Sequence, residues 1–262
     1  MRRSFLTPAL WIPAGLAIAL LGLPLVALIL RAPWVQLPEL LSRSEVLQAL
    51  GLSLATASIA TAVSLVLGIP LALVLARSAD WPAVPRRLLR ALVTVPLVLP
   101  PVVGGVALLL LLGRRGLIGQ FLPFQIPFST SAVVIAQVFV AMPFLVLAVE
   151  GAVRASDRRF ETAAATLGAT RWTILRRVTL PLVAPGVSAG ALLCFTRALG
   201  EFGATITFAG SFPGVTQTLP IATYLELQRD PDAAIALSLT LMVVSVAVLV
   251  TLRDRWVPGL TP

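Results

Sequence analysis

Six long uncharged runs dominate the pattern of apolar and polar positions along the chain. They lie at 9–30, 46–76, 91–113, 129–149, 178–196 and 233–252. A helix needs roughly 20 largely apolar residues to cross the hydrocarbon core of a bilayer, and each run is about that long or longer. The pattern therefore predicts an all-α protein with six transmembrane helices. The second run is longer than a bilayer requires, so we expect that helix to tilt or to extend into the interface.

Two further uncharged stretches need a separate interpretation. The segment 117–131, "LIGQFLPFQIPFSTS", is rich in Gly, Pro, Gln and Phe, which is typical of an interfacial loop and not of a helix. The N-terminus places Arg2 and Arg3 ahead of an apolar run, as a signal peptide does. That run is longer than a typical signal-peptide core, and no small-x-small cleavage site follows before Arg31. We therefore expect an uncleaved first span.

The distribution of arginine predicts how the chain lies in the membrane. All 20 basic residues are Arg, because the sequence has neither Lys nor His. With the N-terminus inside, the cytoplasmic segments hold 14 of them, the outer segments hold five, and Arg197 lies within a span. Positive charge gathers in the cytoplasmic loops of membrane proteins. The count predicts a multi-pass protein of the bacterial plasma membrane with both termini in the cytoplasm.

Composition narrows the classes of function. Hydrophobic residues make up 58% of the chain and charged residues 12%, which is typical of an integral membrane protein. The net charge of +9 is explained by cytoplasmic loops, so we expect no nucleic-acid partner. Cys194 is the single cysteine and stands in an apolar run, where we expect it to pack and not to bind metal. The sequence contains no P-loop and no Ser–His–Asp set, so we expect no ATP hydrolysis by this chain and no cofactor or metal of its own.

The chain shows no internal repeat, low-complexity tail or soluble domain. We therefore treat 1–262 as one transmembrane domain, with its core at 47–252 and a cytoplasmic loop at 151–180.

This loop interrupts the apolar pattern with small residues and positive charge. Asp157 can cap the N-terminus of a short helix, and Gly168 suits the left-handed cap at its end. Thr170 can cap a second short helix, and Pro181 then stands at the mouth of the fifth span, where its missing N–H costs little. The local sequence predicts a short helix, a glycine hinge and a second short helix leading into the membrane.

Two functions fit such a loop. Ala163, Ala164 and Leu167 form a small apolar face that lets another backbone approach closely, and the arginines around them offer charge-assisted contacts. These features predict a docking site for a cytoplasmic partner. The alternative is an amphipathic interfacial helix that its arginines hold to anionic lipid.

The stretch "FETAAATLGATRWTILRRVTLPL" resembles the coupling loop of bacterial ABC importer permeases. That pattern is Glu-Ala-Ala, three residues, Gly, nine residues, Ile, one residue and Leu-Pro. Thr162 stands where the pattern has Glu, Val178 stands where it has Ile, and Glu161 offers a carboxylate one residue earlier. The resemblance implies that the loop inserts into a groove of an ATP-binding subunit. The residues assigned to this coupling are Glu161, Thr162, Ala163, Ala164, Leu167, Gly168, Arg171, Leu180 and Pro181.

The third and fifth spans carry features of a pore. The prolines and glycines of "VPLVLPPVVGG", 95–105, are expected to break or kink the third span inside the bilayer. Backbone groups freed in this way are tolerated only if protein or water satisfies them. A kinked helix of this kind can line a path and move, or it can be a simple packing kink. "TRALGEFGATITFAG", 196–210, closes the fifth span. The pore or gate candidates are Pro96, Pro100, Pro101, Gly104, Gly105, Arg197, Gly200, Glu201, Phe202 and Gly203.

Arg197 and Glu201 are the one charge pair expected at membrane depth, four residues apart on one helical face. An ionisable residue inside the membrane indicates function by default. Arg197 could bind an anionic substrate, but Glu201 would neutralise it and repel an anion. The sequence favours a structural or gate-positioning ion pair.

Together with "GVTQTLPIATYLELQRDPDAAIALSL", 214–239, these stretches resemble the permeases of molybdate importers over roughly 50–250. The resemblance implies the type I, MetI-like permease fold with a cytoplasmic coupling helix. It implies a second copy of the chain, two ATP-binding subunits that bind ATP and Mg, and an extracytoplasmic oxyanion-binding protein. The implied cargo is molybdate or tungstate, imported by alternating access. A sulfate or thiosulfate importer is the closest alternative, and a secondary anion transporter is a more distant one.

Overall fold

In the computed structural model, which describes residues 10–253, regular structure is helical and no strand occurs within that range. This confirms the all-α prediction. The long helices are α1 (Trp11–Leu30), α3 (Ser44–Arg77), α4 (Ala83–Val98), α5 (Pro101–Leu112), α6 (Thr130–Ala155), α9 (Leu180–Leu199) and α12 (Pro231–Arg253). The short ones are α2 (Leu37–Ser42), α7 (Arg159–Thr166), α8 (Arg171–Ile174), α10 (Gly203–Ala209) and α11 (Leu219–Glu226). The 3-10 turns η2 (Ser78–Asp80) and η3 (Gly119–Phe121) and the π-turn η4 (Leu175–Thr179) complete the chain.

Five helices are long and apolar enough to cross a membrane, and α4 with α5 forms a sixth candidate that is bent by 118°. The prediction of six spans is therefore confirmed, and the third span, expected to be broken or kinked by its prolines, is broken. Leu99 and Pro100 are extended, with ψ near 130°, and separate the two helices. A residue before proline is disfavoured in helical conformation, and two prolines in succession remove two backbone donors, so the helix stops and restarts there. Ala9 of the first expected span, and Arg2, Arg3 and Arg255 of the orientation count, lie outside the described residues.

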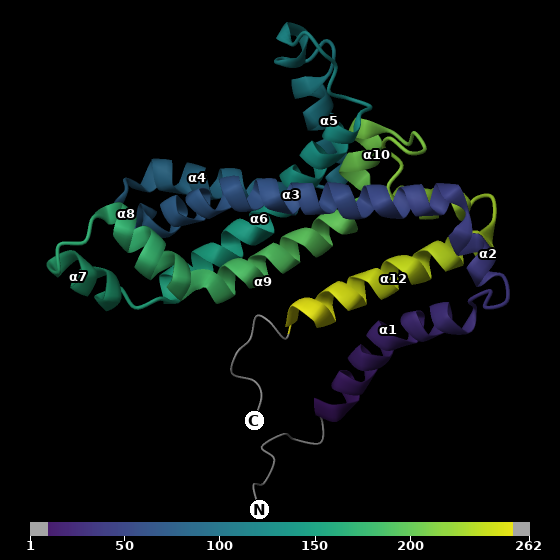
Figure 1. Ribbon diagram of the computed structural model, residues 1–262, viewed down its shortest axis with the longest axis horizontal. Coiled ribbons are helices and arrows are strands. Elements are labelled where there is room, and N and C mark those ends of the chain that lie inside the picture. Colours follow the sequence, from purple (N-terminus) through teal and green to yellow (C-terminus); the bar gives the residue numbers. More distant parts are fainter. Residues whose placement is uncertain (1–9, 254–262) are drawn as a thin grey trace, which may run out of the picture.

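Three long helices, α3, α6 and α9, lie side by side and form the core (Figure 1). Small residues at their contacts let the backbones approach. A Cβ added to Gly68 would lie 3.0 Å from the Leu145 side chain, and one added to Gly190 would lie 3.1 Å from the Cβ of Ala148. Helices in lipid associate largely through such close packing. Cys194 is fully buried in this core, as expected.

The remaining elements lie at the two ends and along the sides of this core. Figure 1 shows α7 and α8 at one end and α2 at the other, with α12 and α1 running along one side. The helices α5 and α10 project together from the opposite side. The segment between α5 and α6 is irregular apart from η3, which confirms the predicted loop at 117–131 except for Thr130 and Ser131, which begin α6.

Candidate functional site

The loop after α6 carries the predicted coupling residues at the end of the bundle. The Asp157 carboxylate accepts a hydrogen bond from the N–H of Arg159 at 2.9 Å, so it stabilises the start of α7 as expected. Every residue of α7 is at least partly exposed, including the predicted small face. Leu167, at the end of this helix, is 88% exposed. The chain thus presents a short helix of small residues to its surroundings.

Gly168 ends α7 in the left-handed conformation, with φ of +82°, which confirms the predicted cap. Two backbone hydrogen bonds close the turn: Gly168 donates to Ala165 at 3.0 Å and Ala169 donates to Ala164 at 3.1 Å. This pair of bonds is the Schellman motif, in which glycine is preferred because it carries no Cβ. The hinge is therefore built from the backbone of the loop itself.

The second helix of the loop differs from the prediction. Its N-cap is Thr170, whose hydroxyl accepts from the N–H of Thr173 at 3.2 Å, as expected. The helix is not a separate short one, because α8, η4 and α9 form one continuous span over Arg171–Leu199. Pro181 is the second residue of α9, as predicted, but the helical turns of α8 and η4 precede it without a break. The π-turn directly before it, with Leu180 donating to the carbonyl of Leu175, widens the helix where the proline ring would otherwise collide with a carbonyl.

The two residues at the acidic position of the motif point in different directions. Thr162 is exposed, and its hydroxyl donates back to the carbonyl of Arg158 at 3.1 Å. Glu161 is only 26% exposed in its side chain and faces the bundle. Its Oε1 accepts from Arg77 at 3.1 Å and from the Thr179 hydroxyl at 2.5 Å. The carboxylate therefore holds α7 to the end of α3 and to η4.

The groove between α7 and α8 is open and lined in part by Arg77, Glu161, Thr162 and Arg171. Arg171 is exposed at the start of α8, whereas Leu180 is half-buried and Pro181 is exposed further along the same span. The coupling candidates thus extend from α7 along one continuous helix into the bundle.

Three of the gate candidates, Pro101, Gly105 and Gly203, meet where α5 packs against α10. A Cβ on Gly105 would lie 2.7 Å from the Cβ of Thr207, and one on Gly203 would lie 2.9 Å from the Cβ of Pro101. Gly104 faces Phe139 of α6, with 2.9 Å from an added Cβ to the ring. These helices approach as closely as they do because the contact positions are glycine.

The other uncharged candidates lie apart from this contact. Pro96 is inside α4, and Pro100 forms the bend. Gly200 follows α9 with φ of −88°, a conformation open to any residue. Phe202 stacks on Tyr224 of α11, with ring centroids 5.0 Å apart.

Arg197 and Glu201 form the predicted ion pair, with 2.5 Å between Nη1 and Oε2. Glu201 does not lie on the same helical face, because α9 ends at Leu199 and Glu201 stands in the break before α10. Its other oxygen accepts from the N–H of Ala204 at 2.9 Å. With a side chain 1% exposed, Glu201 is a buried charge that joins the end of α9 to the start of α10.

Residues 68–258 match the model of a protein family described as "binding-protein-dependent transport system inner membrane component". The chain belongs to this family. The permease is 50% identical over 248 residues to the molybdenum transport system permease protein ModB of Mycobacterium tuberculosis, covering 94% of this chain and 93% of the relative. It is 33% identical to the sulfate transport system permease protein CysT of Escherichia coli, covering 90% and 88%.

The fold of the permease also occurs in solved transporter structures. An inward-facing structure of the MetNI methionine ABC transporter matches 79% of this chain and 93% of its own, with a TM-score of 0.65 at 18% identity. The predicted MetI-like fold is confirmed. The permease is thus a multi-pass membrane subunit of a binding-protein-dependent system.

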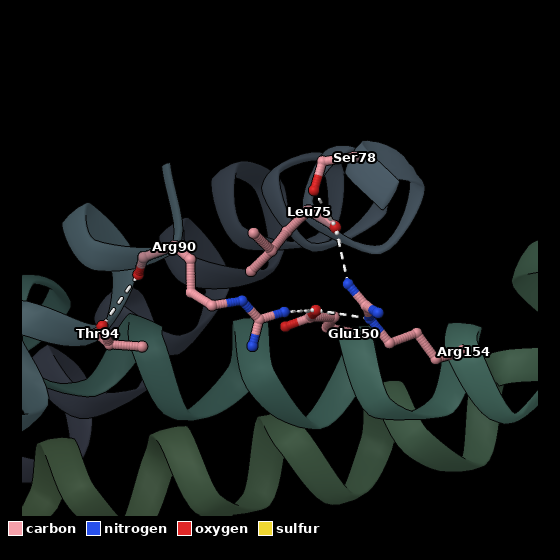
Figure 2. Close-up of polar contacts among 6 residues, drawn as sticks. All are labelled: Leu75, Ser78, Arg90, Thr94, Glu150 and Arg154. Carbon is pink, nitrogen blue, oxygen red and sulfur yellow. Dashed lines mark hydrogen bonds and ion pairs between the residues drawn. The ribbon is translucent and has the colours of Figure 1, made fainter. Parts of the chain in front are cut away.

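Sequence reasoning missed one buried charge cluster in the permease. Figure 2 shows Glu150 of α6 between Arg90 of α4 and Arg154 one turn further along α6. The Glu150 side chain is 5% exposed. The spacing of Glu150 and Arg154 was a signal for an ion pair. Arg90 carried no signal, since it lies 60 residues away in sequence.

Proposed function

We propose that the permease is the membrane subunit of an ATP-driven importer of molybdate, with tungstate as a near-isosteric cargo. The observation that carries the proposal is the 50% identity to a molybdenum transport permease across nearly the whole of both chains. The lower identity of 33% to a sulfate permease makes sulfate the less favoured cargo.

The coupling geometry supports an ATPase partner at the α7 end. The exposed helix α7 presents small residues, and the Schellman turn at Gly168 fixes its end without help from neighbouring side chains. Such a helix suits insertion into a groove on an ATP-binding subunit, two of which would serve two copies of this chain. ATP and Mg then belong to that partner, and the permease needs no cofactor of its own. A secondary anion transporter would have no use for this exposed loop.

The proposed cycle follows from these parts. ATP binding closes the partner dimer, and α7 moves with it. The pore, in part α5 and α10 with their glycine contacts, then opens outward to receive the oxyanion from an extracytoplasmic binding protein. A pore with few free charges suits this division of labour, because a deep internal binding site would slow release.

Reconstitution tests the function directly. The permease with its ATP-binding subunit and binding protein is placed in proteoliposomes, and uptake of radiolabelled molybdate is measured with and without ATP. We expect ATP-dependent uptake that tungstate competes for and equimolar sulfate does not. Uptake driven by an ion gradient without ATP would favour the secondary transporter, and competition by sulfate would favour the sulfate importer.

The orientation has its own test. In a Cys194→Ala background, Leu167→Cys and Val35→Cys each place a thiol on an exposed position, 88% and 96% exposed respectively. An impermeant maleimide added to right-side-out vesicles should label position 35 and not position 167, and inverted vesicles should show the reverse. The opposite pattern would refute cytoplasmic placement of the α7 end.

A further inference from the structure

Helix α4, the first half of the bent span, contacts the bundle through a charge cluster around Glu150. One carboxylate oxygen, Oε1, is shared by Arg90 Nη2 of α4 and Arg154 Nε of α6, the latter at 2.7 Å. Arg154 Nη2 also donates to the carbonyl of Leu75 in the last turns of α3, at 3.3 Å. Figure 2 shows these contacts side by side, so that α3, α4 and α6 are joined through one buried carboxylate.

A second ion pair attaches the coupling helix to the same end of α3. Arg77, two residues after Leu75, donates to Glu161 of α7 at 3.1 Å. The Thr179 hydroxyl shares this carboxylate oxygen. The last turn of α3 therefore contacts α7 through Arg77 and the Glu150 cluster through Leu75.

We propose that these contacts form a strut that transmits the displacement of α7 to α4, and through the bend at Pro100 to α5. In this inference Glu150 and Arg90 are positioning residues: they move α4 together with α3, α6 and α7 as one body. The bend of 118° between α4 and α5 is then the place where the motion is converted into a change at the α5–α10 contact. The ion pairs of this strut stay intact throughout the transport cycle.

The charges and the burial of this cluster indicate that Arg90 links α4 to α6 and does not merely stabilise the fold. The Glu150 side chain is 5% exposed, while those of Arg90 and Arg154 are 48% and 45% exposed. A buried carboxylate that loses all its partners is strongly unfavourable. Glu150 would keep Arg154 if Arg90 were removed, so Arg90 can be changed without leaving the carboxylate uncompensated. Loss of Arg90 therefore removes the ion pair between α4 and α6, while the packing of Val93 on the core and the rest of the cluster stay in place.

The first experiment compares Arg90→Gln with Arg87→Gln. Both change one arginine of α4 to the same residue, and Arg87 is exposed and has no ion pair within residues 10–253. The inference rests on the proposed function, so uptake is measured in the reconstituted complex with its ATPase and binding protein. We expect Arg90→Gln to assemble normally and to keep binding-protein-stimulated ATP hydrolysis. Molybdate transported per ATP should fall at least about fivefold, the lower range of coupling between sites.

The control variant Arg87→Gln should match the wild type in both quantities. A purely structural role for Arg90 would reduce ATPase activity and uptake in the same proportion as the assembled complex, which would overturn the strut. An unchanged ratio of transport to ATP in Arg90→Gln would also overturn it. A wild-type complex that takes up no molybdate would instead refute the proposed cargo, and the same ratio would then be measured with the oxyanion that the complex does transport.

A double-mutant cycle tests whether the two ion pairs act in one chain of contacts. Arg77→Gln should lower the transport ratio in the same way as Arg90→Gln, because it detaches α7 from α3. If both lie on one strut, the double variant should be no worse than the more affected single variant. Multiplicative losses would show two independent effects and contradict a single strut.

Cross-linking tests whether the contact between Arg90 and Glu150 persists throughout the transport cycle. Arg90→Cys and Glu150→Cys are combined with Cys194→Ala, and a short bifunctional thiol reagent joins the two positions in the assembled complex. We expect the cross-linked complex to regain part of the transport ratio that the uncross-linked double-cysteine variant has lost. Complete loss of transport on cross-linking would mean that α4 and α6 must separate, which would overturn the inference.

Discussion

Gly168 is held in its left-handed conformation by backbone hydrogen bonds, and an added Cβ would meet no atom within 4 Å among the described residues. Substitution there changes the backbone preference first and the docking surface second. A non-glycine residue in this conformation costs about 1–2 kcal/mol, and Asn tolerates it best. We expect molybdate uptake to be highest in the wild type and to fall progressively in Gly168→Asn, Gly168→Ala and Gly168→Arg. The Arg variant should remain folded but lose both uptake and pull-down of the ATPase. Gly51→Ala is the control, because Gly51 lies inside α3 and an added Cβ there would meet no described atom within 4 Å.

The pair Arg197–Glu201 gives a second prediction at this scale. Glu201 is 1% exposed, so Arg197→Ala leaves a buried charge without its partner, which typically costs about 3–5 kcal/mol. We expect Arg197→Ala and Glu201→Ala each to lower the amount of assembled complex, measured by size-exclusion chromatography of a fluorescent fusion. The double variant should recover only part of the loss, because the N–H of Ala204 still lacks its acceptor.

A substrate-binding role for Arg197 predicts a different outcome. Arg197→Ala would then assemble at the wild-type level and lose uptake, and removal of Glu201 as well would restore nothing. Assembly and uptake of the three variants distinguish the two roles.

Local chemistry explains which residues the sequence could predict. Gly168 and Thr170 act on groups within a few residues, so their roles follow from the neighbouring sequence. The partners of Glu150 and Glu161 on other helices, Arg90 and Arg77, lie 60 and 84 residues away. Only the packed fold brings these pairs together, and the sequence around an arginine does not indicate which arginine is paired.

At the scale of elements, the decisive feature is the contact between α5 and α10. Proline predicted an interruption near Pro100, but the angle is fixed by where α5 packs, and that depends on glycines of both helices. Gly105→Ala would place a Cβ 2.7 Å from Thr207 and 2.8 Å from the carbonyl of Ala204. Overpacking of this kind costs about 1–3 kcal/mol. We expect Gly105→Ala to lower both the melting temperature of the purified complex and its uptake.

The matched control for this change is Gly51→Ala. Gly51 lies inside α3, and an added Cβ would find nothing within 4 Å in the described part of the chain. Replacing a helical glycine by alanine stabilises by about 0.5–1 kcal/mol where space permits. A melting temperature for Gly105→Ala equal to that of Gly51→Ala would show that α5 can separate from α10 without cost.

At the scale of the whole molecule, many arginines gather at the end of the bundle where α7 lies. Ion pairs there join the end of α3 to α7 and the first turns of α4 to the end of α6. The sequence predicted this grouping from the count of arginines alone, because positive charge follows a rule about the membrane and not about packing. The opposite end carries an acidic segment that runs from the end of α11 into the first turn of α12 and includes Glu226, Asp230 and Asp232.

That segment gives the last prediction, which concerns the binding protein. Asp230 is already engaged, since its Oδ1 accepts from the N–H of Ala233 at 3.1 Å and its Oδ2 lies 3.8 Å from Arg43. Glu226 is half-buried and Asp232 is exposed, and neither forms an ion pair within the described residues.

An acidic rim repels a free oxyanion and attracts basic residues on a carrier, so encounter should be sensitive to salt. Changing Glu226 and Asp232 to Lys should raise the concentration of binding protein that gives half-maximal stimulation of ATPase activity. We expect a rise of roughly tenfold at low salt, since each exposed ion pair contributes up to about 1 kcal/mol. The basal ATPase rate should not change, whereas Asp230→Lys should lower assembly by removing the cap of α12. Stimulation that is equal in wild type and double variant across a range of salt would remove this rim from the interface.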